Sequence, residues 1–168
     1  IKPLQNKGIP LSIRSFLNDS QKGSVISNNG ENDRDIPSFI FKPNQLLISI
    51  STKDYSFIFE DHISELFRLF AEVGLKVHLM QNSALNFSIC GHIKTPLLPK
   101  LLSSLNEKYV VKYNEKVDLL SIRHYKDFEL PDIVKNQEIL IQQRSRSTIR
   151  YVFKKKFKLN WLIITLWN

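Results

Sequence analysis

The chain has 168 residues, of which 42% are hydrophobic and 24% charged, a composition typical of soluble globular proteins. Its formal net charge is +8, and residues 117–168 hold ten Lys and Arg against five Asp and Glu. Such a basic region can attract nucleic acid or an anionic membrane, but it more often forms a solvated edge or faces an acidic neighbouring domain. The single cysteine, Cys90, excludes a disulfide within the chain and favours a reducing compartment, so we expect a cytoplasmic protein.

The first 36 residues are expected to form a leading segment and a linker. Apolar and polar residues alternate over residues 8–16, which predicts a strand, and a second short strand is expected at 24–27. Residues 28–36 lack periodicity and carry four charges, so we interpret them as a linker. No signal peptide is recognisable, and the chain starts at Ile1, so we expect a piece of a longer protein that was cut on its N-terminal side.

The next 80 residues predict the order strand, helix, strand, strand, helix, strand. The helix over 60–74 is the clearest element, because its apolar residues recur at i, i+3, i+4, i+7 and i+8. Asp61 is its expected N-cap, and Gly74 is placed at the C′ position. The other elements are strands at 46–50, 75–81, 85–90 and 109–116, and a helix at 96–108. This order is that of the ferredoxin-like fold, βαββαβ.

The same order then restarts but is not completed. A strand at 117–125, one helical turn within 130–137 and two strands at 138–145 and 148–156 lack a closing helix and strand. The leading segment can supply both. We therefore predict an α+β fold of two ferredoxin-like units: the first, 37–116, is inserted into the second, which combines 1–27 with 117–156.

Residues 157–168 form a tail of unknown role outside both predicted units. Its apolar run WLIITLW has seven residues, far short of the roughly 20 that span a bilayer. We expect an added edge strand, a segment that packs on a partner, or an irregular chain end.

Three stretches resemble the regulatory region of aspartate kinases. GIPLSIRSFLNDSQKGSVIS is similar to the segment that joins their kinase domain to the regulatory region. ISELFRLFAEVGLKVHLMQNSALNFSI looks like the first ACT repeat of this family, and EILIQQRSRSTIRYVF resembles the matching part of the second repeat. Each motif is weak alone, but their order and the interrupted second unit make the resemblance specific over about residues 1–156.

The resemblance implies a tandem ACT region that binds a feedback amino acid, lysine or threonine among them, and forms a homodimer. The parent enzyme would phosphorylate L-aspartate with ATP to 4-phospho-L-aspartate, the first step toward lysine, threonine and methionine. Its kinase domain should lie N-terminal to Ile1. ATP and Mg are expected only in that missing catalytic domain, so this fragment should have no cofactor and no kinase activity of its own.

The resemblance places the effector near the first strand-to-helix loop and the second strand of the first unit. A zwitterionic amino acid needs donors and acceptors at fixed places, which amides, hydroxyls and helix N–H groups supply. Asp54, Asn82 and Ser83 are also good turn residues, and His78 can equally be a surface histidine. The candidate effector-binding residues are Ser51, Lys53, Asp54, Ser56, Asp61, His62, His78, Gln81, Asn82 and Ser83.

Two other classes of function compete with effector sensing. A purely structural dimerisation region would show the same fold without a ligand. A ferredoxin-like nucleic-acid module would need aromatic rings on the central strands with basic residues around them, and only Phe87 and Tyr151 are candidates for such rings. We expect no nucleic acid, membrane or metal partner, because no RNP-like run, spanning segment or zinc-ligand spacing is present.

Overall fold

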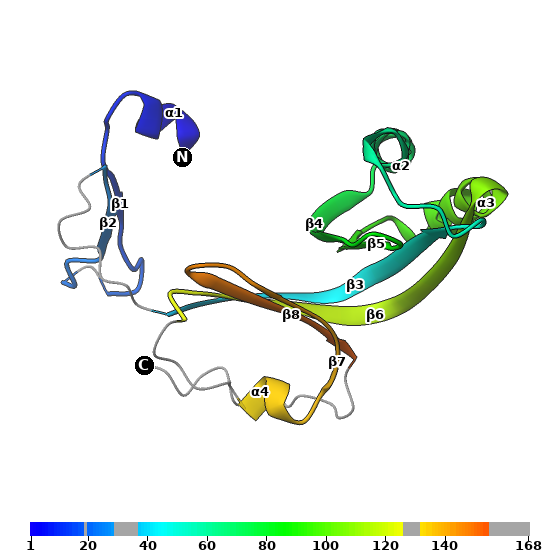
Figure 1. Ribbon diagram of the computed structural model, residues 1–168. Helices are drawn as coiled ribbons and strands as arrows, with labels where there is room; N and C mark the ends of the chain where they lie inside the picture. Colours follow the sequence, from blue (N-terminus) through cyan, green and yellow to red (C-terminus); the bar gives the residue numbers. More distant parts are fainter. Residues whose placement is uncertain (19, 29–36, 126–131, 155–168) are drawn as a thin grey trace. The chain divides into compact units, whose positions relative to one another are not determined.

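The computed structural model describes residues 1–18, 20–28, 37–125 and 132–154, which fall into two compact units, Ile1–Ile36 and Pro37–Asn168 (Figure 1). The first unit contains a short helix, α1 (Lys2–Asn6), and two strands, β1 (Leu11–Ile13) and β2 (Ser24–Ile26). The strands pair antiparallel in a sheet of their own. Both strands predicted in the leading segment are therefore present.

The second unit is built on a six-stranded antiparallel sheet with the strand order β4-β5-β3-β6-β8-β7. Its strands are β3 (Ser38–Thr52), β4 (Lys76–Asn82), β5 (Phe87–His92), β6 (Tyr109–Arg123), β7 (Glu138–Arg144) and β8 (Thr148–Lys154). Its helices are α2 (Glu60–Glu72), α3 (Leu98–Lys108), which follows a 3-10 turn at Thr95–Leu97, and α4 (Asp132–Lys135). The α+β class and the predicted element order are confirmed.

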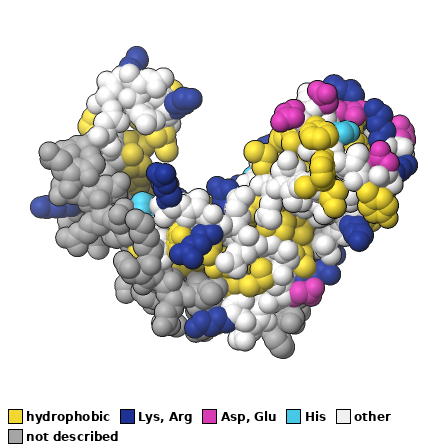
Figure 2. Space-filling view, viewed as in Figure 1, with side chains coloured by type: hydrophobic (Ala, Val, Ile, Leu, Met, Phe, Trp, Pro, Cys, Tyr) yellow, Lys and Arg dark blue, Asp and Glu magenta, His cyan; other side chains and the backbone are white. Residues whose placement is uncertain are grey.

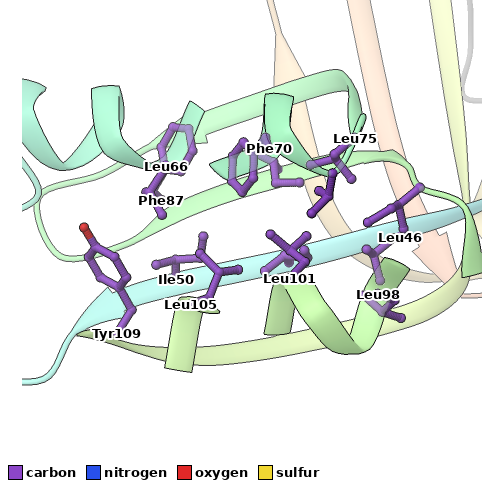
Figure 3. Packing of buried hydrophobic residues seen from close by; sticks show 14 of the residues in the cluster. Leu46, Ile50, Leu66, Phe70, Leu75, Phe87, Leu98, Leu101, Leu105 and Tyr109 are labelled. Carbon is purple, nitrogen blue, oxygen red and sulfur yellow. The ribbon is translucent and has the colours of Figure 1, made fainter. Parts of the chain in front are cut away.

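The first half of this sheet, β4-β5-β3-β6, forms a ferredoxin-like unit with α2 and α3 on one face. Leu66 and Phe70 on α2 and Leu101 and Leu105 on α3 are at most 1% exposed and pack against alternate residues of the strands (Figure 3). Each such side chain stabilises the fold by about 1.5–3 kcal/mol through removal from water. Gly74 ends α2 at φ 64°, as expected for a C′ glycine.

The long strands β3 and β6 run through both halves of the sheet, and each is irregular at its middle. The register shifts between Lys42 and Gln45, and Asn44 and Lys116 adopt left-handed φ angles of 55° and 56°. The Asn44 N–H donates to Oδ1 of the buried Asp118 across the pair, at 3.0 Å. These irregularities turn the paired strands from one half of the sheet into the other.

The second half, β7-β8-β6-β3, repeats the strand order of the first, but its fourth strand is not the predicted one. We expected residues 8–16 in this place, whereas residues 38–42, assigned to the first unit, pair with residues 119–123 of β6. Within the described residues, the six-stranded sheet contains no strand from 1–28. The physical reason is continuity: residues 38–42 extend β3 directly, so they need no loop closure to reach β6.

A second cluster of apolar residues lies on the sheet face opposite α2 and α3. It joins β3, β4 and β5 to β6 and β8, and residues of β7 pack against it. Gln143 Nε2 of edge strand β7 donates to the Met80 carbonyl of edge strand β4, at 3.0 Å, so the sheet curves until its edges approach. In Figure 1, α2 and α3 lie above this curved sheet and α4 lies below it. Cys90 is fully buried in this interior, and burial raises the pKa of its thiol to about 12, as expected for a small apolar core residue.

Candidate functional site

An open cavity of about 450 Å³ lies where β3 ends, α2 begins and α3 passes into β6. It brings together four of the ten predicted residues, Lys53, Asp54, Ser56 and His62. Figure 2 shows acidic and basic side chains intermingled over the part of the molecule that carries α2 and α3. The residues that line the cavity are Thr52, Lys53, Asp54, Ser56, His62, Glu65, Lys108 and Tyr109.

The loop between β3 and α2 is held by a turn around Asp54. Asp54 Oδ1 accepts the Ser56 N–H at 3.1 Å, and the Thr52 hydroxyl donates to the Ser56 carbonyl at 2.7 Å. The hydrogen bonds from Ser56 lower the pKa of Asp54, so this carboxyl group is ionised at neutral pH. Tyr55 takes a left-handed φ of 62° to close the turn. Asp54 thus serves as a turn residue while it also presents a negative charge to the cavity.

Helix α2 begins one residue before the expected cap. Phe59 is the N-cap, and its N–H donates to His62 Nδ1 at 3.2 Å. Asp61, predicted as the N-cap, instead lies in the first turn, is exposed and does not line the cavity. The His62 ring stands edge-on against the Tyr109 ring, with centroids 6.2 Å apart. His62 therefore ties the helix start to the first residue of β6.

Glu65, whose negative charge is paired with Lys108, is one of the residues that line the cavity. The Lys108 ammonium donates to Glu65 Oε1, and the Tyr109 hydroxyl donates to Glu65 Oε2 at 3.1 Å. The bond from Lys108 is the main cause of the lowered pKa of Glu65. Burial, reinforced by the charge of Glu65, raises the pKa of Tyr109 to about 12. The sequence analysis did not predict Glu65, Lys108 or Tyr109 as site residues. Only Glu65 could have been found from the local sequence, because it lies three residues after the predicted His62 and therefore on the same face of the helix.

The remaining predicted residues lie outside the cavity lining. Ser51 is half-buried in β3, while Gln81, Asn82 and Ser83 are exposed at the end of β4. The Ser83 hydroxyl accepts the Asn86 N–H at 3.2 Å, which makes Ser83 part of the turn between β4 and β5. This turn touches the β3–α2 loop, because the Ile58 N–H donates to the Ala84 carbonyl at 3.0 Å. Binding by these residues and by His78 stays a prediction.

Three findings bear on the other classes of function. Phe87 and Tyr151 are 1% and 2% exposed, so neither ring is available to stack on a base. Within the residues that the structure describes, no three His, Cys, Asp or Glu side chains gather as a metal site. Among the described helices, none is long and apolar enough to cross a bilayer.

Comparisons with known proteins find a similarity of fold without a similarity of sequence. No protein-family model and no curated protein sequence matches this chain. Its fold is similar to that of Escherichia coli aspartokinase III in complex with lysine and aspartate, with a TM-score of 0.68 and 16% identity over 90% of this chain. Clostridium acetobutylicum aspartate kinase gives a TM-score of 0.69 and 14% identity over 91% of this chain. This chain spans only 37% and 39% of those two chains.

A shorter relative matches over most of its own length. It is a domain from Porphyromonas gingivalis assigned as the C-terminal regulatory domain of aspartate kinase, with a TM-score of 0.59 and 14% identity. The match covers 72% of this chain and 88% of that domain. The resemblance seen in the sequence is thus confirmed in the fold: this chain has the α+β fold of the ACT regulatory regions of aspartate kinases.

Proposed function

We propose that this chain is the regulatory region of an aspartate kinase and binds a feedback amino acid in the cavity at the start of α2. One observation carries the proposal. The cavity presents charges of both signs beside small hydroxyl-bearing side chains, and an amino acid zwitterion needs one partner of each sign.

The hydrogen bonds of the lining residues indicate which charges are available to a ligand. Glu65 already binds Lys108 and Tyr109. Asp54 accepts hydrogen bonds from neutral groups of Ser56 and Thr52, and Lys53 donates to the Glu107 carbonyl at 2.8 Å. Among the described residues, neither Lys53 nor Asp54 takes part in an ion pair. We assign Asp54 to the ligand ammonium and Lys53 to its carboxylate, with the N–H groups of the first turn of α2 as further donors.

A ligand in this position would act on the arrangement of the regulatory region. It would add contacts between the β3–α2 loop and the junction of α3 and β6, beyond the strand pairing of Thr52 with Tyr109 and the hydrogen bond from Lys53 to the Glu107 carbonyl. Stabilising one arrangement of a homodimer in this way would disfavour the active kinase domain, with a coupling of about 1–3 kcal/mol. The kinase domain of the same parent chain, where ATP and Mg would bind, is the partner that receives this signal.

Thermal unfolding of the chain with lysine, threonine or methionine tests the proposal. A ligand that binds only the folded state stabilises it by about 2.7 kcal/mol at a hundred times its Kd. Asp54→Asn should abolish the stabilisation. Asp61→Asn is the matched control, since it removes the same charge from an exposed residue that does not line the cavity. If no amino acid raises the unfolding temperature, effector sensing is wrong and a structural dimerisation role replaces it.

A further inference from the structure

A group of basic side chains lies on the sheet away from the cavity. Lys42 on β3 and His78 on β4 are both half-buried, and the Lys42 ammonium donates to His78 Nδ1 at 3.0 Å. Lys76 on β4 and His92 on β5 are directly opposite each other in the strand pairing, next to His78. None of the four side chains lines the cavity at the start of α2.

Two irregularities of the sheet bring Lys42 and His78 together. On β4 the register shifts between Val77 and Leu79, so His78 is the extra residue of a β-bulge. The facing residue is Gly91, where a Cβ atom would lie 2.5 Å from the Lys76 carbonyl oxygen, so the close approach of the strands requires glycine. On β3 the register shifts directly after Lys42. Bulges redirect side chains, and here they aim a lysine and a histidine at one point.

Within the residues that the structure describes, no carboxylate forms an ion pair with Lys42 or Lys76. An ammonium can donate to an imidazole nitrogen only while that nitrogen keeps its lone pair. Burial is the main cause of the lowered pKa of His78, and the charges of Lys42, His92 and Lys76 lower it further. Near neutral pH the Lys42 ammonium therefore has a neutral ring as its partner.

We propose that Lys42 and His78, with Lys76 and His92 beside them, form a binding site for a small molecule that carries a carboxylate or phosphate group. The anion would take the Lys42 ammonium as its first partner. His78 would then accept a proton from solvent and donate a second hydrogen bond, because an adjacent anion favours the imidazolium form. Binding takes up a proton, so the affinity increases as the pH falls. The site requires no occupant in the α2 cavity and does not depend on the function proposed for it.

Sulfate and acetate serve as probes, since they keep their charges across the pH range and stand for the phosphate and carboxylate sources. The His78 ring signals, followed by NMR, should shift with added anion, and the pKa of His78 should rise. Binding at about pH 6 should be at least about tenfold tighter than at about pH 8, because the bound anion raises the pKa of His78 from its lowered value in the free chain. A response to sulfate alone identifies a phosphate-bearing ligand, and a response to acetate alone a carboxylate.

Matched variants separate a site from a general charge effect. Lys42→Gln should lose at least about tenfold in affinity, whereas Lys42→Arg keeps the charge and should keep binding. Lys100→Gln, at an exposed position of α3, removes the same charge and should bind like the wild type. The proposal is overturned if neither anion shifts the His78 signals, or if Lys100→Gln weakens binding as much as Lys42→Gln. His78→Gln should bind with no pH dependence; an unchanged dependence would also overturn it.

Discussion

The two halves of the six-stranded sheet share one strand order but are stabilised in different ways. The first half is covered by helices of 13 and 11 residues, and its core is built from those helices and its own strands. In the described part of the second half the only helix is α4, with four residues. That half relies on the continuation of β3 and β6, on the interior of the curved sheet, and on a cluster of β6 and β8 residues against which only Val134 of the described helix residues packs. The comparison teaches that the same strand order can be stabilised by helices packed on the sheet or by strands that continue from the adjacent half.

The largest expected effect is the loss of packing under the long helices. Leu105→Ala should reduce the free energy of unfolding by about 2–5 kcal/mol, because Leu105 is fully buried between α3 and the strands. Val134→Ala, on α4, should cost less, since each buried methylene contributes only about 0.8 kcal/mol. Urea unfolding measures both, with the exposed Ser103→Ala as control. If Leu105→Ala and Val134→Ala reduce the free energy of unfolding equally, the helices contribute alike to both halves and the proposed difference is wrong.

The next effect concerns the close approach of β4 and β5. Gly91→Ala should destabilise the chain by about 1–3 kcal/mol, because its new Cβ meets backbone atoms of β4 that cannot move aside alone. His92→Ala, at the exposed next position, should change stability by less than about 0.5 kcal/mol. Denaturant unfolding checks the difference, and a neutral Gly91→Ala would show that the bulge at His78 can relax.

A smaller effect tests which residues complete the second half. Phe41 on β3 packs against Phe153 on β8, with ring centroids 6.5 Å apart. A double-mutant cycle with Phe41→Ala and Phe153→Ala should give a coupling of about 0.5–1.5 kcal/mol. Phe57, which packs on Phe59 in the β3–α2 loop, is the control partner, and its cycle with Phe153 should be additive within about 0.5 kcal/mol. If the effects of Phe41→Ala and Phe153→Ala are additive, residues 38–42 are not the fourth strand of the second half.

The smallest effect belongs to the cavity, where the charged pair is partly exposed. Glu65→Gln should cost less than about 1 kcal/mol at neutral pH. The folded-state pKa of Glu65 lies below its ordinary value of 4.5, so its contribution is present above that pH and is lost as the pH falls through the lowered pKa. The two proteins should therefore converge in stability in acid. Glu72→Gln, which breaks the exposed Arg68–Glu72 pair, should cost about 0.5 kcal/mol or less.

Half of the residues that line the cavity could be predicted from the sequence. Lys53, Asp54, Ser56 and His62 follow one strand within ten residues, so a polar loop before a strong helix was enough to predict them. Lys108 ends α3 and Tyr109 begins β6, and their contacts with Glu65 span 43 and 44 residues of sequence. Nothing in the local pattern of α3 indicates that its last turn faces the start of α2.

The sequence by itself determined the order of strands and helices, the buried face of α2 and the interior position of Cys90, because apolar periodicity and helix-ending residues act locally. Only the tertiary structure decided that residues 38–42 complete the second half, and that Lys42 meets His78. Both depend on bulges, in which one extra residue changes the register and the direction of every side chain beyond it. The alternation of apolar and polar residues does not mark where such an insertion falls.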